Sequence, residues 1–469
     1  MEFINGVIDF ANGILYHPLC VPLILLLGGI ILTVRSKFIQ VRLFTESFKV
    51  IMEKPKSEEG ISSFGALMVS TASRVGTGNI IGVATAICAG GAGAVFWMWV
   101  TAVIGGASAF VESTLAQIYK RKNPDGTSYG GPAYYMRDAL GQRWLGVIFS
   151  VLIIATYAVG YNMLASYNLQ STFAPFGFYG ESTPAVIGVI LAVLFGIIVI
   201  GGAKRLVKVT GVMVPVMGVI YVIVSIVVLI MNAKQIPAMF AMIFESAFDF
   251  KAIFGGFAGS CVMNGIKRGL YSNEAGMGSA PNAAATADVS HPAKQGLVQM
   301  LSVFLDTLLI CTCTAFMCLS SGVAPDSAMD GASYVQTSLA ATLGSFGPVF
   351  IAVAMSLFAF TTLIGNYSYC EGCLRFILNR EVSKTGLLAF RILATVLVFV
   401  GAVASANTVW NLADMTQGLM VVVNVPVIIL LMKPAMDCLE DYCKQKKAGK
   451  DPEFKAAEAG IKEELEYWN

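Results

Sequence analysis

The sequence predicts an all-α polytopic membrane protein with eleven transmembrane helices, built as a five-plus-five inverted repeat with two broken helices and one extra N-terminal helix. The first supporting observation is composition: 56% of the 469 residues are hydrophobic and 13% are charged, with a mean hydropathy of +0.72. Soluble domains carry about 25% charged residues, so lipid must be the main solvent of this chain. The other observations are the number of long apolar stretches and the glycine-rich interruptions within two of them.

Apolar stretches of about 20 residues, long enough to cross a bilayer as helices, define the predicted spans. They lie near residues 12–34, 64–89, 93–117, 144–171, 183–201, 209–231, 252–275, 294–322, 345–368, 386–404 and 413–432. The seventh stretch is glycine-rich and weakly apolar, but the topology requires it. No basic region precedes the first apolar stretch, so we expect the first span itself, and no cleavable signal peptide, to direct insertion.

Lysine and arginine residues gather in alternate loops, and this pattern predicts the orientation. They follow the odd-numbered spans, with Lys267, Arg268 and Lys294 counted after span seven, and only Lys234 and Lys251 interrupt the pattern. Positively charged loops remain in the cytoplasm. We therefore expect a multi-pass protein of the cell membrane with its N-terminus outside and its C-terminus in the cytoplasm.

These spans divide the chain into four predicted parts. The first holds a peripheral helix and an amphipathic cytoplasmic segment over 41–54, which we expect on the lipid surface; the next two are the five-helix repeats, and the last is a cytoplasmic tail. The parts cover residues 1–61, 62–231, 250–432 and 433–469. Within the tail, residues 451–469 are expected to form a short solvated helix.

Composition also disfavours several classes of function. A net charge of +2 argues against a nucleic-acid partner, because phosphate binding needs a basic surface. The ten cysteines are scattered, mostly in apolar runs where a free cysteine acts as a small hydrophobe, and the CxxC of Cys370 and Cys373 has no second pair. With two histidines and no HExxH motif, a membrane-embedded enzyme is a remote alternative. We expect no enzyme activity and no cofactor.

Two spans carry glycine interruptions, and they are the first helices of the two five-helix sets. Span two contains the run Arg74-Val75-Gly76-Thr77-Gly78-Asn79, and span seven contains Gly255, Gly256 and Gly259 followed by Asn264-Gly265. Transporters commonly bind substrate where two such spans unwind near the membrane midplane. Close helix packing is the alternative interpretation of these glycines, but the intramembrane Arg74 favours a functional break in span two.

Three sequence blocks resemble the alanine or glycine:cation symporter family. They are Gly76–Ile80 with Gly93–Trp99, then Tyr129–Tyr135, and then Lys267–Pro281 extended by His291–Gly296 and Phe304–Thr307. The resemblance covers nearly the whole chain from about residue 60, and its third block is highly specific. It implies a leucine-transporter-like fold and import of a small neutral amino acid, of the alanine and glycine class, with sodium.

The chain departs from the family pattern at two positions. The fourth span of the family reads Gly-Asn-Met-Val-Gln-Ala-Asn, and here Ala165 stands where the pattern has Gln; the ninth span has Gly-Trp, and here Asn366 follows Gly365. Both changes are expected at the pocket wall. An amide in place of an indole adds donors and an acceptor, so serine, asparagine and glutamine are candidates beside alanine and glycine.

A zwitterionic substrate fits two broken helices, because each break exposes unpaired N–H and C=O groups. The N–H groups after the first break are expected to hold the substrate carboxylate, and carbonyl groups between Ser260 and Asn264 its ammonium. With the pocket wall, the predicted substrate-binding residues are Thr77, Gly78, Asn79, Asn162, Ala165, Met263, Asn264 and Asn366.

The resemblance also implies a sodium site against the first break. Its expected oxygen ligands are the backbone carbonyls of Ala72, Val75 and Phe358 and the hydroxyls of Thr361 and Thr362, since sodium requires hard oxygen ligands. The alternative is that both threonine hydroxyls bond back to their own helix.

Buried charges supply a predicted gate and the main alternative function. Arg74, Arg268, Asn273 and Glu274 are interpreted as a gate network, the last three at the cytoplasmic end of span seven; ordinary juxtamembrane charge is the other interpretation. A proton-coupled transporter on the same fold would use Asp306 or Glu112 as its proton carrier. A passive channel is disfavoured by the paired broken helices, and the sequence does not predict the oligomeric state.

Overall fold

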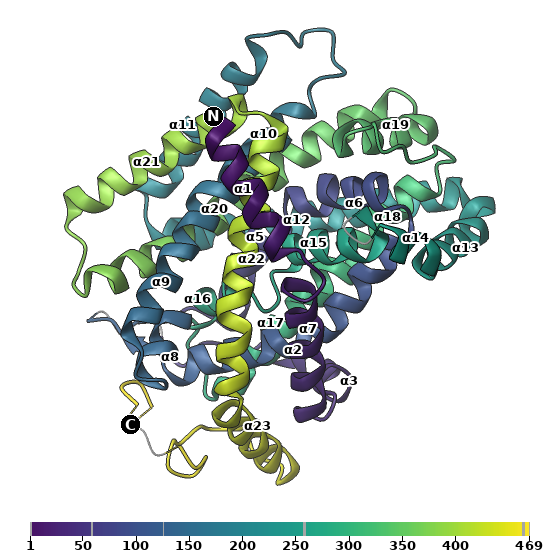
Figure 1. Cartoon of the computed structure of the whole chain (residues 1–469). Helices are drawn as coiled ribbons and strands as arrows, with labels where there is room; N and C mark the ends of the chain where they lie inside the picture. The colour runs from purple at the N-terminus through teal and green to yellow at the C-terminus, as the bar shows by residue number, and fades with distance from the viewer. Residues whose placement is uncertain (1, 58–59, 125, 257–258, 462–464, 469) are drawn as a thin grey trace.

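The structure is a computed structural model that describes residues 2–57, 60–124, 126–256, 259–461 and 465–468, and it is almost entirely helical (Figure 1). The α-helices are α1 (Glu2–Leu15), α2 (Val21–Arg35), α3 (Ile39–Arg42), α4 (Phe44–Ile51), α5 (Ser63–Arg74), α6 (Val83–Gly90), α7 (Gly93–Ile118), α8 (Pro132–Asp138), α9 (Arg143–Ile153), α10 (Asn162–Ser171), α11 (Thr183–Ile200), α12 (Ala203–Met231), α13 (Ile236–Ala247), α14 (Phe250–Gly255), α15 (Cys261–Asn273), α16 (Ala280–Ala284), α17 (Pro292–Val303), α18 (Thr312–Leu319), α19 (Gly331–Leu343), α20 (Phe346–Leu378), α21 (Lys384–Val403), α22 (Ala406–Leu430) and α23 (Met432–Lys447).

The remaining regular elements are short. They are the π-helical segments η1 (Gly78–Gly82), η2 (Ile154–Tyr161) and η5 (Phe304–Cys311), the 3-10 helix η3 (Ala233–Gln235), and the antiparallel strands β1 (Arg121–Lys122) and β2 (Ser128–Tyr129). Because η2 joins α9 to α10 and η5 joins α17 to α18, these helices form two continuous spans.

Eight helical segments of the described chain are long and apolar enough to cross a membrane, which confirms eight of the predicted spans. They cover residues 93–118, 143–171, 183–200, 205–231, 292–319, 346–378, 384–403 and 406–430. The segment over α21 is only 22% buried and that over α7 is 67% buried, so α21 is peripheral and α7 is central. Figure 1 shows α22 extending from α1 near the N-terminus to α23 at the opposite end of the molecule.

The predicted first span over 12–34 is wrong as one continuous helix. The chain turns between α1 and α2, where Cys20 N–H bonds to the His17 carbonyl at 2.9 Å. Pro18 lies in this turn and has no N–H to continue a helix. α1 then packs on α22, where Asn12 Nδ2 donates to the Asn411 carbonyl at 2.9 Å.

The first break lies where the glycine pattern predicts it. α5 ends at Arg74, Val75 leaves helical geometry with ψ of 88°, and the chain resumes as η1 at Gly78. The span formed by α5, η1 and α6 is therefore interrupted at Val75 and Gly76.

The second break lies ten residues later than the sequence predicts. α15 is regular through Asn264 and Gly265, and a Cβ on Gly265 would lie 2.6 Å from Trp97 Cβ, so this glycine allows close packing on α7. The chain leaves the helix at Glu274, with φ of 56°, and resumes as α16. Of the glycines predicted to interrupt this span, Gly255 ends α14 and Gly259 precedes α15; residues 257–258 between them lie outside the described residues.

Two further expectations are wrong. Lys267 and Arg268 lie inside α15, and Lys294 lies inside α17 with 1% exposure, so none of the three belongs to a solvated loop after span seven. The described part of residues 451–469 contains no helix, and its side chains Phe454 and Leu465 are buried, because the tail packs back onto the helices.

Candidate functional site

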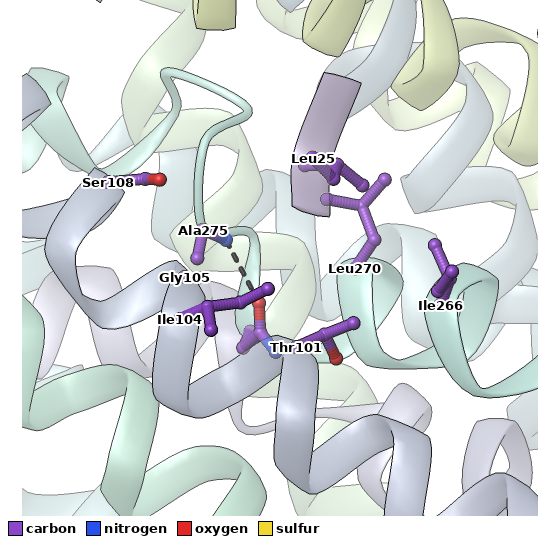
Figure 2. Close-up of a pocket in the computed structure, with 9 residues that line it drawn as sticks. Leu25, Thr101, Ile104, Gly105, Ser108, Ile266, Leu270 and Ala275 are labelled. Carbon is purple, nitrogen blue, oxygen red and sulfur yellow. Dashed lines mark hydrogen bonds between the residues drawn. The ribbon is translucent and has the colours of Figure 1, made fainter. Parts of the chain in front are cut away.

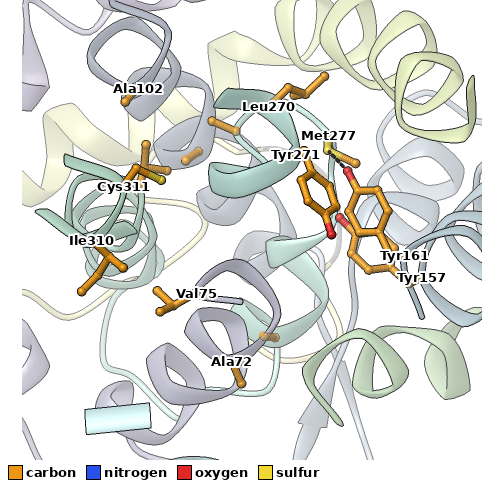
Figure 3. Close-up of a cluster of buried hydrophobic side chains, with 14 of the residues drawn as sticks. Ala72, Val75, Ala102, Tyr157, Tyr161, Leu270, Tyr271, Met277, Ile310 and Cys311 are labelled. Carbon is orange, nitrogen blue, oxygen red and sulfur yellow. Dashed lines mark hydrogen bonds between the residues drawn. The ribbon is translucent and has the colours of Figure 1, made fainter. Parts of the chain in front are cut away.

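The two breaks lie next to each other. Ser73, in the last turn of α5, places its hydroxyl 2.8 Å from one carboxylate oxygen of Glu274, and Ser279 donates to the other oxygen at 2.7 Å. Beyond the first break, the Thr77 hydroxyl lies 2.9 Å from the Tyr271 hydroxyl at the end of α15. Figure 3 shows Tyr271 beside Tyr161. The ends of four half-helices therefore meet in one buried region.

Several backbone groups of the first break are already hydrogen-bonded. Val75 N–H donates to the Thr71 carbonyl at 2.7 Å, and Gly76 N–H donates to Asn79 Oδ1 at 2.7 Å, so these two donors are already used. A Cβ on Gly78 would lie 2.9 Å from two carbons of the Tyr271 ring. Only glycine permits this approach of backbone to a neighbour.

Asn79 connects the first break to a buried carboxylate. Its Nδ2 donates to Asp306 Oδ1 at 2.7 Å, while the Ser272 and Thr307 hydroxyls donate to Asp306 Oδ2 at 2.7 and 2.8 Å. Asn79 lies in η1 and Asp306 in η5, so two π-helical segments face each other here. π-helical turns of this kind are frequent at functional sites.

The predicted pocket wall is assembled in part. Asn366 in α20 places Oδ1 2.6 Å from the Ser73 hydroxyl and donates through Nδ2 to Asn162 Oδ1 at 2.9 Å. Asn162 Nδ2 is buried without a partner in the described chain. Ala165 is buried one turn later on α10. The structure thus brings Asn162 and Asn366 to the first break.

The two threonines of the predicted sodium site differ. Thr361 Oγ1 donates to the Leu357 and Phe358 carbonyls at 3.0 Å, the back-bonded alternative. Thr362 Oγ1 is buried with no partner among the described residues and sits where a Cβ on Gly76 would lie. A Cβ on Gly365 would likewise overlap the backbone of Ala72 and Ser73, so α20 packs closely along the end of α5.

Three buried carboxyl groups lie within electrostatic range of one guanidinium. Arg74 is 1% exposed, and its Nη1 lies 3.3 Å from the Gln299 carbonyl, while Nε and Nη2 have no partner in the described structure. Glu112, Glu274 and Asp306 are each fully buried and interact electrostatically with Arg74.

Glu112 joins this group to the second break. Its Oε2 accepts the Gly278 N–H at 3.1 Å and Asn424 Nδ2 at 2.9 Å. Within the described residues, no lysine or arginine forms a direct ion pair with Glu112, Glu274 or Asp306. The center of the protein therefore holds three carboxyl groups and one guanidinium group.

Arg268 lies apart from the region where the two breaks meet. It pairs with Asp414 at 2.8 Å and stacks over Trp410 at 4.3 Å. It is about 9 Å from Glu274 along the α15 axis, at 1.5 Å per residue, on the side of the break where α1 packs. Asn273 bonds to Thr307 Oγ1 at 3.2 Å and so belongs to the central region. Sequence reasoning missed Asp414 and Trp410, because only the fold brings α22 to α15.

Met263 and Asn264 are also separated from the breaks. Asn264 Nδ2 bonds to the carbonyls of Gly259 and Ser260 at 3.1 and 3.2 Å, within its own helix start. A Cβ on Gly90 would lie 2.8 Å from Asn264 Cβ. Both residues therefore lie beside the far end of α6, and the ammonium site predicted there is not next to the carboxylate site.

A small cavity beside the second break is shown in Figure 2. Its lining is mostly apolar and consists of Leu25, Thr101, Ile104, Gly105, Ser108, Ile266, Leu270, Asn273 and Ala275. With a volume of about 10 Å³, it has room for roughly one water molecule and not for an amino acid.

Paired broken helices around a buried polar center define a secondary transporter with the leucine-transporter-like fold. The crystal structure of MhsT in complex with L-phenylalanine matches with a TM-score of 0.54 and 16% identity, over 86% of this chain and 92% of that one. The chain belongs to the sodium:alanine symporter family, whose sequence profile matches residues 1–456. It is therefore a sodium-coupled amino-acid symporter and not an enzyme.

Three relatives cover almost the whole chain. The amino-acid carrier protein AlsT of Bacillus subtilis is 45% identical over 100% of this chain and 98% of its own length. The probable sodium/glutamine symporter GlnT of the same organism is 45% identical over 97% of this chain and 94% of its own length. The sodium/alanine symporter AgcS of Methanococcus maripaludis is 37% identical over 92% of this chain and 95% of its own length.

Proposed function

We propose that this protein imports a small neutral amino acid with sodium by alternating access around the two breaks. The five-plus-five inverted repeat comprises residues 62–231 and 250–432, after one extra N-terminal helix in 1–61 and before the C-terminal part 433–469. One observation carries the proposal: buried polar atoms without partners, Thr362 Oγ1 and Asn162 Nδ2 in the described chain, converge where the breaks meet.

The substrate carboxylate binds at the N–H groups of Thr77, Gly78 and Asn79, of which the Asn79 N–H also donates to the Gly76 carbonyl at 3.1 Å. These groups lie at the start of the outer half-helix, whose positive dipole end favours an anion. The substrate ammonium binds at the opposite kind of terminus, the last turn of α15, where carbonyl groups lack helical partners. Glu274, at the C-cap of α15, adds a negative charge beside them.

Sodium binds between α5 and α20. Its ligands are the carbonyls of Ala72, Val75 and Phe358 with the hydroxyls of Thr361 and Thr362. The close packing of Gly365 on Ala72 supports this assignment, because it brings the two sets of oxygens onto facing surfaces.

The substrate side chain faces Asn162, Ala165 and Asn366. A buried amide donor without a partner discriminates in favour of substrates that can accept its hydrogen bond. This supports glutamine, asparagine and serine beside alanine and glycine. The 45% identity to a relative described as a probable sodium/glutamine symporter supports the same set.

Two gates flank this region. Arg268 with Asp414 and Trp410 closes the side nearest the N-terminus, which we place outside the cell. Arg74 with Glu112 and Glu274 closes the side nearest the C-terminus, which we place in the cytoplasm. Asn273 links the second break to the central hydroxyl cluster.

Uptake by purified protein in proteoliposomes tests the proposal. We expect labelled alanine to accumulate under an inward sodium gradient and not under a proton gradient alone. Accumulation driven by protons alone would favour the second candidate, a proton-coupled carrier that uses Asp306 or Glu112. That candidate is supported by the burial of both carboxylates and by a 42% identical relative described as a putative sodium/proton-dependent alanine carrier, YrbD of Bacillus subtilis.

A further inference from the structure

The last residues of the chain dock onto the face of the molecule opposite the N-terminus (Figure 1). Phe454, Ile461 and Leu465 are buried there. Phe454 N–H donates to the Ser290 carbonyl at 2.9 Å, and the Ser290 hydroxyl donates to the Pro452 carbonyl at 2.8 Å. The C-terminal segment is therefore attached to the connection between α16 and α17.

Tyr467 and Trp468, the aromatic pair, make the most specific of these contacts. Trp468 Nε1 donates to the Gln117 carbonyl at 2.8 Å, and the Tyr467 hydroxyl donates to Asp288 Oδ1 at 3.2 Å. The Lys120 ammonium lies 3.7 Å from the center of the Tyr467 ring and 4.9 Å from that of Trp468. The pair thus closes over a lysine that is 1% exposed, a geometry in which a cation is attracted to both ring faces.

The residues under the aromatic pair hold both broken spans. Gln117 Nε2 and Lys120 Nζ donate to the Ala287 carbonyl at 3.0 and 2.9 Å, just after α16. Asp288 N–H donates to the Ile61 carbonyl at 2.8 Å, just before α5. Through Ala287 and Asp288, the end of α7 therefore connects the N-terminal end of α5 to the C-terminal end of α16.

Trp468 also covers the junction directly. Its ring packs against a small buried cluster of Ala66, Ala287 and Val289 with Ile61 beside it. Ala66 lies in the first turn of α5. In alternating access, the half-helices on one side of the substrate must separate before a path opens to that side. The aromatic pair occupies the surface across which this separation must occur.

We propose that the C-terminal aromatic pair is a lock on the pathway: docked, it holds α5 to the α16–α17 connection, and it must leave before this side opens. The proposal rests on the proposed alternating-access function. The contacts it adds favour the closed side by roughly tenfold, the equilibrium shift that one partly desolvated cation–π contact and one hydrogen bond produce. A shift of that size is readily reversed in each cycle.

Accessibility of a cysteine deeper in α5 tests the lock. Ser70 is buried, and its hydroxyl bonds only within α5, to the Leu67 carbonyl. The reporter protein carries Ser70→Cys, with serine replacing the partly exposed Cys20 and Cys443. Its modification by a membrane-permeant maleimide is measured in proteoliposomes. We expect Trp468→Ala to accelerate modification roughly tenfold.

Two further variants make the test specific. Lys455→Gln alters an exposed side chain of the same segment, whose ion pair is with Glu458, and should leave the modification rate unchanged. Tyr467→Phe keeps the ring over Lys120 and removes only the bond to Asp288, so it should give a smaller increase without opening a cavity.

Equal modification rates in Trp468→Ala, Tyr467→Phe and Lys455→Gln would overturn the lock. Sodium-driven uptake of labelled alanine in the same vesicles separates this result from failure of the proposed function. If uptake is retained and the modification rates of the variants are equal, only the lock is rejected. If sodium-driven uptake is absent both in the reporter protein with the wild-type C-terminus and in the protein without the cysteine substitutions, the transport proposal itself is rejected.

Discussion

Replacing Thr362 by valine should separate sodium binding from folding. The Thr362 hydroxyl is buried and has no hydrogen-bond partner in the described chain. Removing a buried unsatisfied hydroxyl eliminates a desolvation penalty of about 1–3 kcal/mol, so Thr362→Val should fold at least as stably as the parent without sodium. If the hydroxyl is a sodium ligand, its loss removes a contact to a charged group worth about 1.5–3 kcal/mol.

The expected result is a large change in sodium dependence, with a thermal stability in the absence of sodium at least equal to that of the parent. A loss of 1.5–3 kcal/mol corresponds to a sodium concentration for half-maximal uptake raised by roughly ten- to 150-fold. The assay combines alanine uptake over a sodium titration with melting curves of purified protein at zero and saturating sodium. Bound sodium stabilises the folded protein, and this stabilisation should shrink in the variant.

Thr361→Val is the matched comparison. Thr361 Oγ1 already donates to two carbonyls at 3.0 Å, so its removal leaves those acceptors with their helical bonds and should cost little stability. As a second hydroxyl ligand it should also weaken sodium binding. If Thr362→Val retains the parent sodium dependence, the reasoning from the unpartnered hydroxyl is refuted; if only Thr361→Val retains it, Thr361 is not a ligand.

Gly78→Val should abolish the thermal stabilisation that substrate gives, because a Cβ at this position would lie 2.9 Å from the Tyr271 ring. In the control Gly82→Ala the Cβ would lie 3.4 Å from the same ring, and substrate should bind normally. Equal substrate binding by both variants would show that Gly78 is not part of the site. Asn366→Trp should shift competition of labelled uptake toward alanine over glutamine and asparagine, and an unchanged ranking would contradict the polar-pocket argument. Burial lowers the pKa of His291 to about 4, below its unfolded value near 6.5, so its protonation favours unfolding and stability falls as pH drops from about 6.5 toward 4. Between pH 7 and 5, the protonation of His291 should cost roughly 2 kcal/mol of folding stability. His291→Asn, which can still cap α17, should therefore lose less melting temperature over this pH range than the parent. The same loss in both proteins would show that other groups cause it.

Hydropathy and charge located most of the helices, because a span buried in lipid must be apolar along most of its length. They could not distinguish the two roles of glycine. Gly265 lies in the seventh predicted span and Gly276 directly follows it, yet Gly265 packs tightly on α7 and Gly276 adopts φ of 84° in the break. Both roles favour glycine, and only the tertiary contacts decide between them.

The candidate site was predictable where it depends on local sequence and unpredictable where it depends on long-range pairing. The break at Gly76 follows from the run of small residues around it. The link from Ser73 to Glu274, and the pairing of Arg268 with Asp414, join residues far apart in the chain. No periodicity encodes such pairs, and the π-helical turn that presents Asp306 has no sequence signal of its own.

The central carboxylates have a consequence for the electrical behaviour of the carrier. Glu112, Glu274 and Asp306 against Arg74 give three negative and one positive formal charge, a sum of −2, in a fully buried region. Each elementary charge that crosses the membrane field changes the energy by about 2.3 kcal/mol per 100 mV. If all three carboxyl groups are ionised and move through the membrane field, the empty carrier is anionic there, and we expect a negative interior voltage to speed its return to the outside. Bound sodium offsets this charge, which makes the loaded step less sensitive to voltage than the empty one.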